Sequence, residues 1–237
     1  MVITILLSHL VSDFLLQNDS LARWKSRQLK GVLVHGLIVL VVTWLFSLTR
    51  DPRWWPWALF IGLTHMLIDA VPLWLGRRVP LQGQGTFALA RLLVDQAAHV
   101  SIILMALVAS GYLEASSLPV DLYFALHSNR SLAFALGYVF ITMPAWILVE
   151  FMAFGLVNGS APDFSQATNK YVGILERGLI TTFVVTGQLT LAPVVALPRL
   201  VLEGPQVMGS RRATLYVAEL LASVMIAIVT GLALRWV

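Results

Sequence analysis

The sequence predicts an all-α protein, a polytopic transmembrane bundle of about seven helices, and two observations lead to this class: the composition and the form of the apolar runs. Of the 237 residues, 58% are hydrophobic and only 12% are charged, whereas a soluble domain has about 25% charged residues. So few charges would not cover the surface of a soluble protein of this length, but they suit a surface that faces lipid. The apolar runs are continuous rather than alternating, which indicates helices and not a barrel.

Seven apolar segments are long enough to cross, or nearly cross, a bilayer core of about 30 Å, which takes about 20 helical residues. In chain order they are 1–17, 31–49, 54–75, 88–112, 132–157, 171–202 and 213–236. The first segment is short. It has no basic start and no small-residue cleavage site, and it contains ionisable residues, so we interpret it as a membrane helix rather than a secretory signal. The sixth is long and carries Pro193 and Pro198, which predict a kink or a break within it.

Ionisable residues suggest a division of the bundle. Residues 1–112 are predicted to form a four-helix membrane core that bears His and Asp side chains. Residues 113–237 are predicted to add three further membrane helices, which complete the same bundle.

Cations in the connections indicate the orientation. The connection 18–30 contains four of them, and the connection 76–87 contains Arg77 and Arg78. Because these connections alternate along the chain, they share a side, which the positive-inside rule makes cytoplasmic. The prediction is a multi-pass protein with its N-terminus outside and the lipid bilayer as its main partner. The cations are spread over short connections instead of forming a basic groove, which excludes nucleic acid as a partner.

A set of histidine and aspartate residues forms the candidate functional site. Four of the five histidines lie in the first four apolar segments, one in each. They are His9, His35, His65 and His99. Three of them have an aspartate four residues away, and a helix stacks such a pair on one face. The aspartates are Asp13, Asp69 and Asp95.

These seven residues are predicted to lie at matched depth. Counted from the cytoplasmic ends of their segments, they fall in a slab about one helical turn thick. A carboxylate in hydrocarbon costs about 2.5–3.5 kcal/mol, so the aspartates must face one another, a cation or water. Imidazoles and carboxylates in one layer are ligands for one divalent transition metal, or for two, with Zn²⁺ as the first candidate and Mn²⁺ or Fe²⁺ as alternatives. Each aspartate could instead orient its histidine.

The chain has no cysteine, which excludes thiolate catalysis and Cys-type zinc sites and favours an open metal site over a closed structural one. Two further ionisable residues begin the sixth segment, Glu176 and Arg177. One interpretation is an interfacial pair whose Arg177 reaches toward water. The other is assistance to the site, with Glu176 as a general base or extra ligand and Arg177 as an anchor for an anionic head group.

The motifs of the first half resemble a known family. They are His-Leu-x-x-Asp-Phe-x-x-Gln (His9, Asp13, Phe14, Gln17), a His early in the second segment, His-x-x-x-Asp (His65, Asp69), and Asp-Gln-x-x-His (Asp95, Gln96, His99). Over about residues 5–110 the chain resembles a bacterial integral-membrane family described only as domain of unknown function 3307. The resemblance implies the bacterial inner (cytoplasmic) membrane. The family is similar to inner-membrane proteins described as membrane-bound metal-dependent hydrolases, which also have His/Asp pairs in membrane helices. This similarity is an analogy of motif and fold.

Three hypotheses for the function stay open at this point. The first is a membrane-embedded metal-dependent hydrolase that takes an amphiphilic, lipid-like or membrane-associated substrate from the cytoplasmic leaflet. Its metal ligands would be His9, His35, His65, His99, Asp69 and Asp95, with Asp13 as a ligand or a base and with Glu176 and Arg177 assisting. The second is a proton or divalent-cation transporter or channel that uses the same layer, although the outer halves of the second to fourth segments are nearly all apolar. The third is a structural membrane subunit; a homo-oligomer is compatible with all three.

Overall fold

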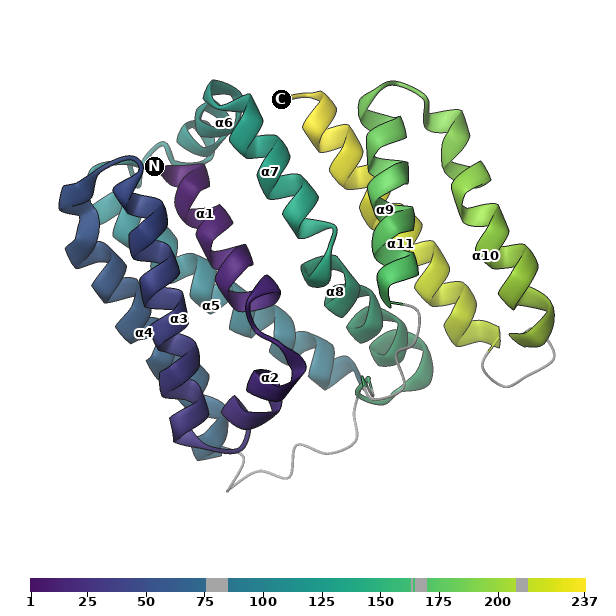
Figure 1. Ribbon diagram of the computed structural model, residues 1–237, viewed down its shortest axis with the longest axis horizontal. Coiled ribbons are helices and arrows are strands. Elements are labelled where there is room, and N and C mark those ends of the chain that lie inside the picture. The colour runs from purple at the N-terminus through teal and green to yellow at the C-terminus, as the bar shows by residue number, and fades with distance from the viewer. Residues whose placement is uncertain (76–84, 163, 165–169, 208–212) are drawn as a thin grey trace. The chain divides into compact units, whose positions relative to one another are not determined.

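Every regular element in the described part of the chain is a helix, which confirms the all-α class (Figure 1). The computed structural model describes residues 1–75, 85–162, 164, 170–207 and 213–237. The chain divides into two compact units, and each is described below by itself. The first unit is Met1–Leu81 with Leu93–Leu136, and the second is Gln82–Leu92 with Gly137–Val237.

The described residues of the first unit form six α-helices and two short helical turns. They are α1 (Val2–Leu10), the π-helical turn η1 (Val11–Leu15), α2 (Asp19–Lys25), α3 (Leu29–Leu48), the 3-10 turn η2 (Pro52–Trp54), α4 (Trp55–Leu75), most of α5 (Gly85–Ala109), and α6 (Leu118–Ser128). The helix α2 begins at Asn18, whose Oδ1 accepts a hydrogen bond from the Leu21 amide at 2.8 Å, as an N-cap does. The helix α3 packs against α1, α2 and α4.

An apolar core closes the end of the first unit that holds the N-terminus. Its buried residues come from the start of α1, the start of α4 and the end of α5, and they include Val2, Ile5, Ala58, Ile103 and Leu107. The buried histidines and aspartates of the unit lie outside this apolar core.

The second unit contains the later helices, which pack mainly around the last one. They are α8 (Met143–Ala153), the π-helical turn η3 (Phe154–Asn158), α9 (Lys170–Val185), the 3-10 turn η5 (Leu189–Leu191), α10 (Ala192–Val207) and α11 (Ala213–Arg235), and α7 (Arg130–Phe140) crosses from the first unit into this one. The helix α11 contacts α8, α9 and α10. Ile180, Val184, Ala192 and Ala227 form the centre of their packing.

The predicted sixth segment is broken, but not at its prolines. The helix α9 ends at Val185, Gly187 follows with a φ of 81°, and α10 begins at Ala192 and packs back against α9. Glycine adopts this left-handed conformation without a steric penalty, so it turns the chain here. Pro193 lies in the first turn of α10, where its missing N–H costs little, and Pro198 lies inside that helix.

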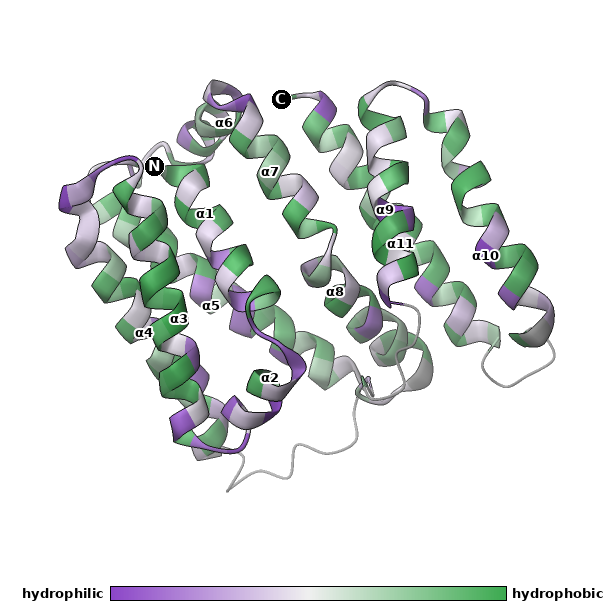
Figure 2. Cartoon of the chain, in the orientation of Figure 1, coloured by the Kyte–Doolittle hydropathy of each residue, from purple (hydrophilic) through white to green (hydrophobic). Residues whose placement is uncertain are grey.

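Four described helices are long and apolar enough to cross a membrane: Leu29–Leu48, Pro52–Trp74, Gly85–Ala109 and Ala213–Arg235. The bent pair α7–α8 would make a fifth span, and Val2–Leu15 is apolar but shorter. This number is roughly compatible with the predicted seven. Figure 2 shows hydrophobic residues along most of these helices and hydrophilic ones along the connection from η1 into α2. Arg77 and Arg78, which support the predicted orientation, lie outside the described residues.

Candidate metal centre

Six of the seven predicted ligands are buried together in the first unit. They are His9, Asp13, His35, His65, Asp69 and His99, and none is more than 8% exposed. The helices α1, α3, α4 and α5 and the turn η1 each contribute at least one of them. The seventh, Asp95, lies at the edge of the group with 32% of its side chain exposed.

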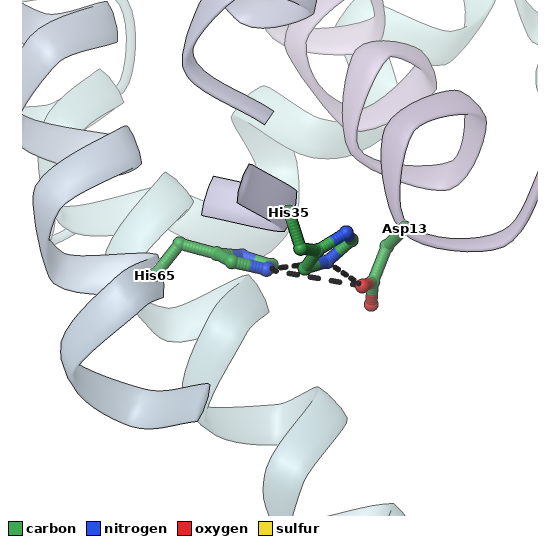
Figure 3. Close-up of side chains that lie close together, drawn as sticks. All are labelled: Asp13, His35 and His65. Atoms are coloured by element: carbon green, nitrogen blue, oxygen red, sulfur yellow. Dashed lines mark hydrogen bonds and ion pairs between the residues drawn. The ribbon is translucent and has the colours of Figure 1, made fainter. Parts of the chain in front are cut away.

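Four ligand-type atoms form the middle of this cluster. The Nε2 atom of His35 lies 3.0 Å from Oδ1 of Asp13 and 3.2 Å from Nε2 of His65 (Figure 3). Oδ2 of Asp69 lies 3.6 Å from Nε2 of His35 and 3.4 Å from Nε2 of His65. The remaining separation given by the structure, His65 Nε2 to Asp13 Oδ1, is 3.8 Å. Asp13, His35 and His65 each offer a ligand atom within 4.8 Å of the other two, and so do His65, Asp69 and His99. Three ligands of this kind leave one position of a tetrahedral divalent cation open.

Each of these four atoms has a hydrogen-bond partner, but the partners are shared. A neutral imidazole nitrogen carries either one hydrogen or one lone pair, and an ionised carboxylate only accepts. The Nε2 atom of His35 has three close neighbours at this point, on Asp13, His65 and Asp69, and can use its hydrogen for only one of them. A cation in the triad of Asp13, His35 and His65 would instead contact all three residues at once. Imidazoles and carboxylates together suit Zn²⁺, Mn²⁺ or Fe²⁺.

The turn that carries Asp13 is π-helical, and this changes the pairing that the sequence predicts. The Leu16 amide donates to the Val11 carbonyl at 2.9 Å, a bond across five residues instead of four. An α-helix would stack Asp13 over His9. In this wider turn, Asp13 instead makes its short contact with His35 of α3.

Lys25 is a site residue that sequence reasoning missed. Its Nζ lies 3.1 Å and 3.3 Å from the two carboxylate oxygens of Asp69 and 3.8 Å from Oδ1 of Asp13. Lys25 comes from the last turn of α2, in the connection whose cations we used only to assign a side of the membrane. Four cations within a short connection beside buried aspartates are the only sequence signal for this contact. Asp13, Asp69 and Lys25 together carry a net charge of −1, which leaves room for a further cation.

Gly31 allows α2 to approach closely enough for Lys25 to reach the centre. A Cβ at this position would lie 2.5 Å from the backbone nitrogen of Lys25 and 2.6 Å from the backbone carbon of Trp24. We expect Gly31→Ala to push α2 away from α3 and to withdraw Lys25 from Asp69, at a cost of about 1–3 kcal/mol in the free energy of unfolding. Thermal unfolding in detergent measures this loss.

Gly178→Ala is a matched control for this prediction, because a Cβ there meets nothing within 4 Å. It should leave stability unchanged or raise it by up to about 1 kcal/mol, as alanine does in a helix. Equal unfolding midpoints for the two variants would contradict the close approach of α2.

Gln96 connects the two ends of the cluster. Its Nε2 donates to Oδ2 of Asp13 at 3.1 Å and to Oδ2 of Asp95 at 3.3 Å. Because Oδ2 of Asp13 is engaged in this way, Oδ1 is the atom that faces His35 and His65. A polar partner that orients a ligating carboxylate is a common feature of metal sites.

A small cavity of about 10 Å³ adjoins the cluster on the side of the apolar core. Its polar lining comes from His9, His65, His99 and Thr43, and the rest is aliphatic. A space of about 10–15 Å³ is the least that holds one water molecule. The cavity can therefore take a single water beside the imidazoles.

Glu176 and Arg177 lie in the second unit, with contacts of their own. Arg177 is only 1% exposed, and its Nε donates to the Ile141 carbonyl at 2.7 Å. It also donates to Ser223 Oγ at 3.0 Å and to the Thr142 carbonyl at 3.3 Å. Glu176 pairs with Arg199 at 3.4 Å. The assisting role of the two residues stays a prediction.

Arg177 holds the break between α7 and α8, whose carbonyls it binds. We expect Arg177→Met to lower the free energy of unfolding by about 3 kcal/mol, because it leaves buried acceptors without donors. Arg130→Met is the control, since Arg130 is exposed at the start of α7. Chemical denaturation in mild detergent compares the stabilities of the two variants. Equal stabilities would contradict the conclusion that Arg177 stabilises the break between α7 and α8.

Comparison with known proteins identifies the family of the chain. Residues 1–124 match the family model described as protein of unknown function, DUF3307, and this region contains every residue of the metal centre. Searches of the curated proteins and of the solved structures found no match. The match covers more than half of the chain and agrees with the resemblance of its motifs. The chain belongs to the DUF3307 family of proteins of unknown function.

Proposed function

We propose that this protein is a membrane-embedded metal-dependent hydrolase that acts on an amphiphilic substrate from the cytoplasmic leaflet of the bacterial inner membrane. The observation that carries the proposal is the buried triad of Asp13, His35 and His65, whose ligand atoms all lie within 4.8 Å of one another. A divalent cation held there would supply a water of lowered pKa and would polarise an ester, amide or phosphoester oxygen. Zn²⁺ is the first candidate, since catalytic zinc sites combine three ligands of this kind with an open position for water.

Among the described residues of the first unit, the exposed edge of the cluster lies at Lys25 and Asp95, which favours hydrolysis over transport. Lys25 and Asp95 are 20% and 32% exposed in their side chains, so solvent reaches the cluster at their edge. On the opposite side, the apolar core of Val2, Ile5 and Leu107 contains no charged group. A cation path across the membrane needs polar groups on both sides of its binding site.

The segment beside the entrance supports an anionic amphiphile as the substrate. The connection 18–30 carries four cations against one aspartate, a net charge of +3. It also exposes Trp24, and the adjoining Leu16 and Leu29 are exposed as well. Cations and large apolar side chains together are typical of a segment at a membrane interface. An acyl chain could lie on the apolar surface while an anionic head group reaches Lys25.

The experiment that tests this function joins metal loading to turnover. Purified protein in mild detergent is stripped with a chelator, reloaded with Zn²⁺ or Mn²⁺, and incubated with an extracted bacterial lipid fraction. The proposal predicts hydrolysis products that depend on the metal and disappear in Asp69→Asn. Metal-dependent cation flux in proteoliposomes without any hydrolysis product would replace the proposal with a transporter.

A further inference from the structure

His99 presents a lone pair to the interior of the cluster. Its Nδ1 lies 2.9 Å from the carbonyl oxygen of Asp95. A carbonyl can only accept, so Nδ1 carries the hydrogen, and Nε2 of the neutral ring carries the lone pair. Within the described residues this Nε2 is buried and has no hydrogen-bond partner. It faces Oδ1 of Asp69 at 3.9 Å, so a lone pair faces a carboxylate oxygen with no hydrogen between them.

His9 also offers an unpartnered nitrogen. Its Nε2 is buried and without a hydrogen-bond partner in the part of the chain that the structure describes. The His9 ring stacks on that of His99, with centroids 5.8 Å apart.

Asp69 connects this pair of imidazoles to the first set of ligands. Its Oδ2 faces His35 and His65, whereas its Oδ1 faces His99. A carboxylate with its two oxygens in two ligand sets is the usual bridge of a two-metal site, whose cations lie about 3.5–4 Å apart. The cavity beside His9 and His99 adds space for one water.

We propose that the centre holds two divalent cations, and that Asp69 bridges them. The first would bind to Asp13, His35, His65 and Oδ2 of Asp69. The second would bind to Oδ1 of Asp69 with Nε2 of His9 and His99. In His99 the other ring nitrogen is hydrogen-bonded to the Asp95 carbonyl, which is the arrangement found in most metal-ligating histidines. This inference rests on the metal binding proposed above.

Charge indicates the order in which the cations bind. Asp13, Asp69 and Asp95 supply three negative charges and Lys25 one positive charge, a net charge of −2. One divalent cation neutralises this charge. A second leaves the centre at +2, which a hydroxide and an anionic substrate would offset. The second cation therefore binds more weakly than the first.

The test measures the number and the coupling of bound Mn²⁺ ions. Metal-free protein in detergent is titrated with Mn²⁺, and bound metal is measured together with the electron paramagnetic resonance spectrum. Two ions per chain, bound in a tight step and a weaker step, with an exchange-coupled spectrum, are the expected result. In His99→Ala the weaker step and the coupling should be lost, while His127→Ala, in α6, should keep both.

The outcomes separate the two proposals. One Mn²⁺ per wild-type chain, with an uncoupled spectrum, would overturn the two-cation centre and leave the proposed function in place. No bound metal in the wild type would overturn both. Because the number and the coupling are measured on the wild type, the result stands even if His99→Ala fails to fold.

Discussion

Replacing His65 by alanine is expected to remove the metal from the centre and to abolish hydrolysis. The Nε2 atom of His65 lies 3.2 Å from that of His35 and 3.4 Å from Asp69, and its ring lies 4.1 Å from that of His99. His65 therefore lies beside both ligand sets. Loss of a hydrogen-bonding neighbour of a metal ligand costs about 10–100-fold in affinity, and loss of a ligand should cost at least about 100-fold. Competition against a chromophoric chelator measures the change.

The fifth histidine offers the control for this prediction. His127 lies in α6, where its Nδ1 bonds to the Tyr123 carbonyl at 2.8 Å. His127→Ala should keep the affinity of the wild type. A His65→Ala protein that binds metal as tightly as the wild type would show that the four-atom arrangement is not a metal site. The polar layer would then be the hydrogen-bond network of a structural subunit.

Replacing Lys25 by methionine is expected to separate metal binding from turnover. The ammonium group contacts both oxygens of Asp69, so it repels a cation held by the same carboxylate. At an effective dielectric constant of about 20, two unit charges about 5 Å apart interact by about 3 kcal/mol. Metal affinity should therefore rise by about tenfold or more. Turnover should fall by about 10²-fold, because the anionic transition state loses a preorganised cation.

Lys30→Met is the matched control, since Lys30 belongs to the same connection and is exposed. It should leave metal affinity unchanged and reduce turnover only slightly. Equilibrium dialysis and initial rates under metal saturation give the two quantities separately. A parallel fall of affinity and turnover in Lys25→Met would contradict this account, because it would mean that Lys25 only orients Asp69 for the metal.

The layer of His and Asp could be predicted because spacing and position along the sequence are enough to infer it. Helical spacing places residues four apart on one face, and a common depth follows from counting along apolar segments. Placing the carboxylate of an aspartate such as Asp69 in lipid costs too much free energy. The side chain is therefore expected to face the inside of the bundle. These arguments brought His9, His35, His65 and His99 to one place without any knowledge of how the helices pack.

The details of the centre needed tertiary structure. Nothing in the sequence distinguishes the π-helical turn of Asp13 from an α-helix, so the partner of Asp13 was predicted as His9 instead of His35. Lys25 was missed because its contact depends on how closely α2 approaches α3, which Gly31 decides through the absence of a Cβ. The sequence of a short connection with several cations shows that the connection is positively charged. It does not show which of the cations contacts the buried aspartates.

The break in the sixth segment shows a similar limit. The prolines predicted an interruption, and the interruption exists, but the chain turns at Gly187. Proline in the first turn of a helix is tolerated, so Pro193 is compatible with the start of α10. The sequence signal for this turn is therefore Gly187, which takes a left-handed conformation at the end of α9, and not either proline.

X-ray absorption at the zinc edge of the protein, purified in mild detergent and loaded with Zn²⁺, tests the central claim most directly. The account predicts stoichiometric zinc whose nearest neighbours are nitrogen and oxygen at about 2.0–2.1 Å, with the scattering pattern of at least two imidazoles. His35→Ala should remove one imidazole from this pattern. Protein that retains no zinc, or zinc surrounded by oxygen alone, would contradict a metal centre built from these histidines.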